Sequence, residues 1–340
     1  MLIQKNNRFS FALVAVLMIA LVFAACTKQE HLAPQSPQEV VQKETVFQKH
    51  LQENTQRLVA EDLGSGRYHV VGAQGTVVNI DNALVNAAGE RVRGTVEIEL
   101  IEIYDPVEMM LNRKQTLADY DGRIELLQSG GEVFVQVYQN GEELRLDGQG
   151  EMQLLLPTAN TGGAKENMEL YYGEEVGEQV MWKPTGEKVE VVRSQDRSDI
   201  EAYLVLLQGM LGWINVDIIY AYPGTPVNCI QFIIDCDLPC TIDPSNAFTA
   251  IYIPGLNSAF ELTQVSHNEF TLCGQQGAVM TLGGAPATFV FALDCGHGYI
   301  YTIMVTTIIS SSGNHVEIVD CSMMQTMDYP GFQNALEAML

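Results

Sequence analysis

Hydrophobic residues along much of this chain recur at every second position, the spacing of a β-strand with one buried face. The clearest case lies in residues 92–104, where aliphatic residues alternate with glutamates: Val96, Glu97, Ile98, Glu99 and Leu100. After Leu100 the apolar positions shift by one, to Ile101 and Ile103. We therefore expect either a bulge at this point or a strand end that is covered on both faces.

Similar alternations follow at residues 133–137 and 144–156. The Asn140-Gly141 pair between them favours a two-residue hairpin turn, since both central positions of a type I′ turn need positive φ. The Gly130-Gly131 pair predicts a bend or a bulge where no side chain fits. Short strands joined by Gly and Asn turns predict an all-β fold, with a first β-sandwich over residues 67–195.

A second β-rich region follows the polar, charge-dense residues 193–199, where we place a domain boundary. It begins with a nearly continuous apolar run, Tyr203–Tyr222. We predict a strand from Ile214 onward, because that part is rich in β-branched residues. The apolar segments and turns that come later predict a second β-sandwich, Ig-like or transthyretin-like, over residues 200–340.

Three segments have helical rather than β spacing. Residues 38–62 carry sparse apolar positions among Gln, Glu and Lys, and predict a surface helix. Residues 106–116 predict either an irregular excursion of the chain or a single helical turn. A short C-terminal helix that docks on the core is predicted from the spacing of Phe332, Leu336 and Leu340.

The first 25 residues have the layout of a secretory signal peptide. Lys5 and Arg8 precede an uncharged, almost wholly apolar run, Phe9–Phe23, which is shorter than the ~20 residues that span a bilayer as a helix. Two alanines and Cys26 follow. We therefore interpret the run as a cleaved signal rather than as a transmembrane anchor.

The ending Phe23-Ala24-Ala25-Cys26 resembles the lipobox of bacterial lipoproteins. In that family the signal is cut before the cysteine, whose thiol carries a diacylglycerol. The resemblance implies that Cys26 is the lipid attachment site and that a membrane is a partner through this anchor. Position 27 is not the aspartate that retains some lipoproteins at the inner membrane, which favours the outer membrane, on its periplasmic face or at the cell surface. Residues 26–66 would then form a tether, in part helical.

A second resemblance rests on five segments: Gly75-Thr76-Val77-Val78-Asn79-Ile80, Asn82-Ala83-Leu84-Val85, Gly89-Glu90-Arg91-Val92-Arg93-Gly94-Thr95-Val96, Glu102-Ile103-Tyr104-Asp105 and Ser129-Gly130-Gly131-Glu132. These resemble a group of Gram-negative surface lipoproteins whose first domain is similar to the ZU5 β-sandwich. The resemblance covers about residues 68–157 and implies a binding or scaffolding role. None of its motifs carries catalytic chemistry.

Charge narrows the choice of partners. The formal net charge is −24, and loss of Lys5 and Arg8 with the signal makes it −24 − 2 = −26. Such a chain repels phosphate backbones, so we expect no nucleic-acid partner. From Ser198 to Leu340 there is no Lys or Arg. The stability of this half must then come from apolar packing and cross-links, and its surface either has low charge density or suits a cationic or metal-rich partner.

Six cysteines lie in the second region: Cys229, Cys236, Cys240, Cys273, Cys295 and Cys321. Their even number and an oxidising compartment predict disulfides, among fifteen possible pairings. One alternative is a zinc site at Cys236 and Cys240 with histidines from the same region (His267, His297 and His315). Another is a calcium site made by the Asp-Cys dipeptides at 235, 294 and 320. We expect neither metal, and no cofactor.

The sequence contains no nucleophile elbow, zincin motif or phosphate-binding loop. Aromatic residues could form a sugar-binding platform, although core positions suit them better: Tyr171, Tyr172, Trp182 and Trp213. Met323, Met324 and Met327 fit flexible core filler better than a soft-metal site. We therefore predict a non-catalytic binding or scaffolding protein with a protein or glycan partner. The alternatives are a glycan- or nutrient-binding lipoprotein, and an envelope hydrolase whose site would show as a cleft with two coupled carboxylates.

Overall fold

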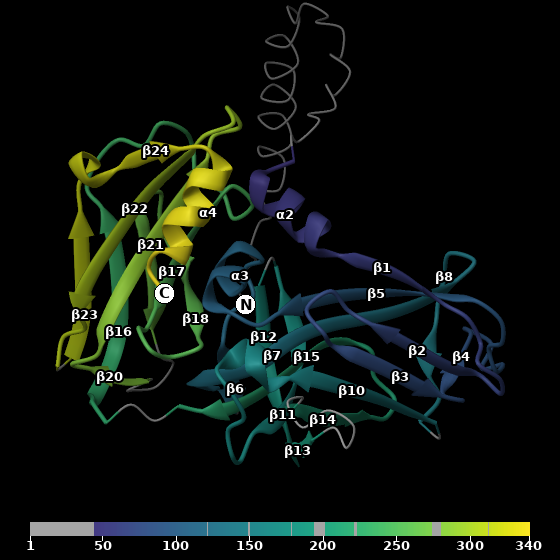
Figure 1. Ribbon diagram of the computed structural model, residues 1–340. Coiled ribbons are helices and arrows are strands. Elements are labelled where there is room, and N and C mark those ends of the chain that lie inside the picture. The colour runs from purple at the N-terminus through teal and green to yellow at the C-terminus, as the bar shows by residue number, and fades with distance from the viewer. Residues whose placement is uncertain are drawn as a thin grey trace, which may run out of the picture. The chain divides into compact units, whose positions relative to one another are not determined.

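The computed structural model describes residues 44–340, apart from positions 121, 149, 178, 194–200, 221–222, 274–279 and 312. Residues 44–340 form one compact unit, which is mostly β and ends in a short helix (Figure 1). The predicted all-β sandwich fold is confirmed. The signal peptide, Cys26 and residues 26–43 of the predicted tether lie outside the described residues. Within the described ranges, no helix is long and apolar enough to cross a membrane.

The first lobe consists of two sheets that face one another. Sheet A has the order β1-β5-β7-β15-β11-β12-β6, with β8 paired to β7. Its strands are β1 (Gln56–Ala60), β5 (Val96–Ile103), β6 (Leu117–Tyr120), β7 (Arg123–Gln139), β8 (Glu142–Glu143), β11 (Glu169–Val176), β12 (Gln179–Lys188) and β15 (Gly212–Ile219). Sheet B has the order β13-β14-β10-β3-β2. Its strands are β2 (Arg67–Val71), β3 (Val77–Asp81), β10 (Glu151–Pro157), β13 (Glu190–Arg193) and β14 (Glu201–Leu207). The short strands β4 (Leu84–Val85) and β9 (Arg145–Leu146) form a ribbon of their own.

The second lobe is one sheet of nine strands, in the order β20-β16-β19-β18-β17-β21-β22-β24, with β23 paired to β16. Its strands are β16 (Thr225–Ile234), β17 (Ala247–Tyr252), β18 (Ala259–Gln264), β19 (Glu269–Cys273), β20 (Met280–Gly283), β21 (Pro286–Asp294), β22 (Ile300–Ile308), β23 (Gly313–Val319) and β24 (Gln325–Met327). The helices of the compact unit are α2 (Val46–Asn54), α3 (Pro106–Leu111) and α4 (Tyr329–Glu337), and short 3₁₀ turns lie at η2 (Thr158–Thr161) and η3 (Cys321–Met323).

The central part of sheet A is buried on both faces. Val133, Val135 and Val137 of β7 point toward sheet B and belong to the core between the two sheets. The opposite face packs with apolar residues of the second lobe and of the helices, among them Phe248 and Phe332. At the end of β5 every residue from Leu100 to Ile103 is buried. Two explanations were expected for the shifted alternation, a bulge or a strand end covered on both faces. The second is confirmed.

The sheets do not change at the predicted domain boundary. Residues 194–200 of that boundary lie outside the described residues. On its C-terminal side, β14 pairs with β10 and β13, and β15 pairs with β7 and β11. Both strands therefore belong to the first lobe. The chain enters the nine-stranded sheet of the second lobe only between Ile219 and Thr225. The run that begins at Tyr203 is so uniformly apolar because it supplies strands to both sheets of the first lobe.

The predicted surface helix over residues 38–62 is wrong in extent. Thr45 caps the start of α2 through a capping box with Gln48, and the helix ends at Asn54. Leu58 and Val59 lie in β1, where they pair with β5. Phe47 is buried against the second lobe, so the part of the predicted tether from residue 44 onward belongs to the compact unit.

The other two helical predictions are confirmed with one correction. The turn at residues 106–116 is α3, which Asp105 caps and Pro106 begins. The C-terminal helix α4 docks through Phe332 and Leu336, which are fully buried. Leu340 does not take part, because the helix ends at Glu337 and the Leu340 side chain is exposed.

The Gly130-Gly131 pair forms the predicted bulge. The pairing of β7 with β15 passes from Glu132 opposite Asn215 to Ser129 opposite Asp217, so two residues of β7 face one of β15. Gly131 has a φ of 129°, and a Cβ there would lie 2.5 Å from Cε1 of Tyr104. The buried tyrosine ring thus excludes any side chain at this position.

Gly131→Ala is expected to lower the free energy of unfolding by about 2–4 kcal/mol, because strain and a clash with Tyr104 add together. Gly163→Ala is the matched control, since Gly163 has a φ of 100° with no atom near its missing Cβ. It should cost only about 1 kcal/mol. Urea titrations of both variants measure the difference, and equal losses would show that the clash contributes nothing.

Candidate binding site at the junction of the lobes

The loop between α3 and β6, residues 112–116, is polar yet buried. Its five residues are Asn112, Arg113, Lys114, Gln115 and Thr116. Arg113 has a φ of 57°, which turns the chain out of α3 and toward the second lobe. There the backbone N–H of Thr116 donates to the carbonyl of Ala259 at 2.9 Å. The loop therefore lies between the lobes and contacts both.

A buried ion pair joins this loop to the second lobe. The Arg113 guanidinium donates to Glu261 through Nε to Oε1 at 3.2 Å and through Nη2 to Oε2 at 3.0 Å. The two side chains are only 10% and 3% exposed. Nε2 of Gln179 on β12 donates to the same Oε2 at 2.6 Å, and Nη1 of Arg113 donates to the carbonyl of Pro244. The network holds β12, β18 and the loop together and uses both oxygens of Glu261.

A pocket of about 370 Å³ opens beside this network. Arg113 and Gln179 contribute polar atoms to its wall, but most of the lining is apolar, including Val176, Pro244, Phe248, Leu262 and Phe270. Its volume lies at the lower end of the range for small-molecule sites, which often form where domains meet. The lining suits a small apolar or amphipathic molecule.

A second hollow lies on the outer face of sheet B. It has a volume of about 590 Å³ and spans β2, β3 and β10. Its lining is mixed in charge, with Arg67, His69, Asp81 and Glu151 among its residues. A polar ligand would suit this hollow better than the junction pocket.

Two acidic side chains are fully buried in sheet A, on β7 and β15. Glu132 lies opposite Asn215, and Asp217 lies opposite Ser129. Nδ2 of Asn215 donates to Oδ2 of Asp217 at 2.6 Å. Within the described part of the chain, Oδ1 of Asp217 and both carboxylate oxygens of Glu132 have no hydrogen-bond partner. Burial with few or no hydrogen-bond donors makes a charged carboxylate costly, so this environment favours the protonated forms of both acids.

Burial raises the pKa of Asp217 to about 7, against the hydrogen bonds from Ser129 and Asn215 that favour its charge. Burial also raises the pKa of Glu132 well above its usual range; the charge of Asp217 adds to this shift, and Lys114 opposes it. The Lys114 ammonium lies 4.9 Å from the centre of the Trp213 ring. Lys114 thus places a cation near the acid pair.

The acid pair lies inside the molecule rather than in a cleft. Neither acid lines the junction pocket or the hollow on sheet B. The loop between β17 and β18 of the second lobe binds the backbone of Ser129: its N–H donates to the carbonyl of Asn257 at 2.9 Å, and Asn257 Nδ2 donates to the Ser129 carbonyl at 3.0 Å. The second lobe thus packs directly against the strand that carries Glu132, and both acids are fully buried.

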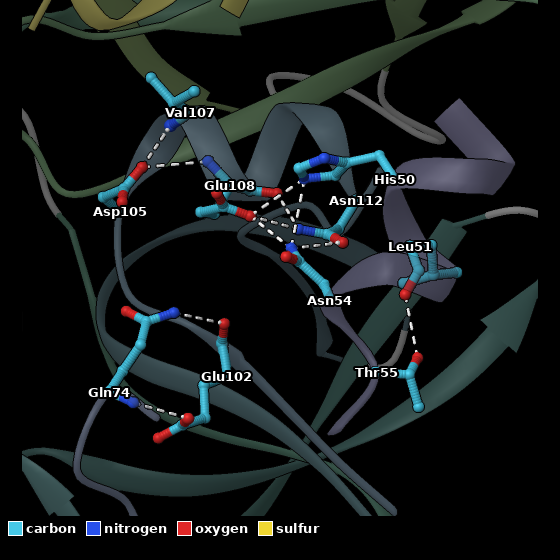
Figure 2. Close-up of polar contacts among 10 residues, drawn as sticks. All are labelled: His50, Leu51, Asn54, Thr55, Gln74, Glu102, Asp105, Val107, Glu108 and Asn112. Carbon is cyan, nitrogen blue, oxygen red and sulfur yellow. Dashed lines mark hydrogen bonds and ion pairs between the residues drawn. The ribbon is translucent and has the colours of Figure 1, made fainter. Parts of the chain in front are cut away.

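A third polar cluster joins α2 to α3 (Figure 2). Glu108 Oε2 lies 3.2 Å from Nε2 of His50 and accepts from the side-chain amides of Asn54 at 2.7 Å and Asn112 at 2.8 Å. Burial by itself would raise the pKa of Glu108, but the hydrogen bond and charge of His50, with the two amides, lower it below its usual value. The cluster fastens α2 to the body of the protein. Nearby, Asp105 caps α3 and Glu102 accepts from Gln74, as Figure 2 also shows.

The six cysteines of the second lobe form three pairs at disulfide distance. The pairs are Cys229–Cys273, Cys236–Cys321 and Cys240–Cys295. Because Cys236 and Cys240 have different partners, they supply no thiolates for the zinc alternative. The Cys236–Cys321 pair brings two of the three Asp-Cys dipeptides together, but Asp294 lies elsewhere and accepts from the backbone of Val46. No group of three His, Cys, Asp or Glu suited to a metal ion is found in the described ranges.

Three of the four aromatic candidates are core residues. Tyr171, Trp182 and Trp213 are buried in the cluster between sheet A and the second lobe, which rules them out as a sugar platform; Tyr172 is half-buried. Among the methionines, Met324 packs against the core of the second lobe and Met327 against the cluster beside α4, whereas Met323 is exposed. The prediction of core filler is therefore wrong for Met323.

In comparisons with known proteins, the chain matches no protein-family model and no curated protein. The ion pair, the acid pair and the junction pocket were not found from the sequence, and they are defined by the structure alone.

Arg113→Ala should lower the free energy of unfolding by about 3–5 kcal/mol, because it leaves Glu261 buried without its counter-charge. Arg57→Ala is the control, because Arg57 pairs with Glu99 at 3.0 Å but is 68% exposed. Its loss should cost at most about 1 kcal/mol. Urea titration measures both values. A small effect of Arg113→Ala would mean that the ion pair does not hold the lobes together.

Asp217 should make stability fall as pH rises. Its pKa is raised on folding, so the folded state binds the proton more tightly, and this stabilisation is present at low pH and lost as pH rises through about 7. Asp217→Asn should remove about 2 kcal/mol of the difference in unfolding free energy between pH 5 and pH 8. The exposed Asp81→Asn should leave that difference unchanged. Identical pH dependence of Asp217→Asn and the wild type would contradict the assignment.

Proposed function

We propose that this protein is a lipid-anchored, non-catalytic binding or scaffolding protein of the cell envelope, held at the outer membrane through Cys26. The segment that ends in Phe23-Ala24-Ala25-Cys26 supports the anchor, because it combines a short apolar run with a cysteine after small residues. A mature lipoprotein carries two or more acyl chains, which suffice for stable membrane attachment. The acidic chain needs such an anchor, since anionic headgroups repel it.

The observation that carries the proposal is the cysteine arrangement of the second lobe. All six cysteines after Cys26 fall into three pairs at disulfide distance. They lie in a region without Lys or Arg, so salt bridges to those residues from within it cannot replace cross-links. Disulfides persist outside the reducing cytosol. An exported location and this arrangement therefore support each other.

The placement of the polar groups favours binding over catalysis. The Arg113 guanidinium in the wall of the junction pocket already donates to Glu261 and Pro244. Glu132 and Asp217 are coupled as a hydrolase would need, but they are sealed inside sheet A. The pocket can hold a ligand, while Arg113 is engaged in the ion pair that joins the lobes and the two acids are buried within sheet A.

The junction pocket also supports a second candidate, a nutrient-binding lipoprotein. The pocket's apolar lining favours a small apolar or amphipathic nutrient over a glycan. A glycan would need exposed aromatic faces, and Tyr171, Trp182 and Trp213 do not provide them.

Cys26→Ser should release the protein from membranes. In a Gram-negative host, the wild type should sediment with membranes and require detergent for extraction, and its mature N-terminal peptide should begin at Cys26 with an added diacylglycerol mass. A Cys229→Ser/Cys273→Ser double variant removes a pair of cysteines but keeps the anchor, and it should remain membrane-bound. Membrane association of Cys26→Ser at the wild-type level would overturn the proposal.

A further inference from the structure

Strand β23 of the second lobe is an open sheet edge (Figure 1). It runs parallel to β16, from Gly313 opposite Val227 to Val319 opposite Ile234. No described strand pairs with its other side. In a strand paired on one side only, the outward backbone N–H and C=O groups are available to another chain.

The most exposed side chains near the end of β23 are apolar, whereas its one acidic residue, Glu317, is half-buried beside His315. Val316 is 44% exposed and Ile318 is 61% exposed. They share the outer face with Gln231 and Ile233 of β16, which lie opposite them. The strand contains no Lys or Pro, two of the usual devices that protect an edge, and the one irregularity in its pairing lies on β16 between Val227 and Cys229.

Other edges of the molecule differ from β23. The edge strand β13 has four residues and carries Glu190 and Arg193. The edge strand β2 carries Arg67 and His69 on its outer face. These edges are protected by short length or by charge, so the apolar edge of β23 stands apart from them.

Negative charge gathers at the C-terminal end of β23. Asp320 follows the strand directly, and the Cys236–Cys321 pair joins its neighbour to the segment that carries Asp235 and Asp237. The backbone N–H of Asp235 donates to the carbonyl of Val319 at 2.7 Å, which places Asp235 beside the strand end. All three carboxylates are exposed.

We propose that the β23 edge binds an extended segment of a partner protein, which adds to the sheet as a further strand. The segment would have apolar side chains at alternate positions, to pack on Val316 and Ile318, and Lys or Arg at the end that lies beside Asp235 and Asp320. Charge complementarity selects this occupant, because residues 198–340 contain thirteen acidic residues and no Lys or Arg. A second copy of this lobe has no basic residue to place there.

The inference adds the class of partner to the proposed binding role, and it is independent of the lipid anchor. The test uses the full-length protein in detergent and a fluorescent peptide of two lysines followed by alternating threonine and valine. Fluorescence anisotropy should show saturable binding that weakens as salt is raised. A peptide with two glutamates in place of the lysines should bind at least tenfold more weakly. Hydrogen exchange should slow in residues 313–319 when the basic peptide is bound.

Two matched variants place the binding at the edge. Ile318→Lys puts a positive charge on β23 and should weaken binding of the basic peptide at least tenfold. Val265→Lys adds the same charge at another exposed valine of the lobe, 54% exposed, and should change affinity less than twofold. Asp235→Asn with Asp320→Asn should weaken binding and reduce its dependence on salt.

Three outcomes of the peptide experiments would each overturn the inference. They are equal binding of the acidic and basic peptides, equal losses in the two lysine variants, and absence of peptide binding. A dimer of the wild type that Ile318→Lys converts to a monomer would make the occupant a second copy, which also contradicts a basic partner segment. Loss of membrane attachment in Cys26→Ser leaves these results unaffected. The proposed lipid anchor and the proposed binding at β23 are therefore tested independently of each other.

Discussion

Burial of both faces of the central part of sheet A is the constraint on which the rest of the structure depends. One face closes the core of the first lobe, and the other packs against the second lobe and the helices α2, α3 and α4. A sheet covered in this way cannot leave either lobe without exposing a large apolar surface. Residues 44–340 therefore form one unit rather than two sandwiches joined by a linker.

The same constraint explains where the polar groups lie. Side chains on the second face of sheet A are covered by another lobe instead of by water, so each must find a partner or give up its charge. The same holds for Arg113 of the α3–β6 loop and Glu261 of β18, which are buried in the junction and pair with each other. Glu132 and Asp217 instead have a raised pKa. The junction pocket lies where the lobes diverge, and the open edge of β23 lies where the sheet of the second lobe ends.

The sequence predicted the parts of the fold that depend on local spacing. The strands, the bulge at Gly130-Gly131, the turn after Asp105 and the docking of Phe332 all follow from short-range pattern. The buried polar residues could not be predicted. In the sequence, Glu132 alternates with apolar residues as a residue on a solvent-exposed strand face would, and the polar composition of the α3–β6 loop is typical of a surface loop. Only Asp217 gave a signal, as a lone charge in an apolar run. Cysteine pairing also depends on the tertiary fold, which brings together residues up to 85 positions apart.

Native-state hydrogen exchange at low denaturant concentrations tests the shared sheet most directly. If sheet A joins the lobes, amides of β5 and β7 in the first lobe and of β17 and β21 in the second should open with the same free energy and the same dependence on denaturant. Protection that persists in β17 and β21 while β5 and β7 exchange through unfolding would contradict a single cooperative unit.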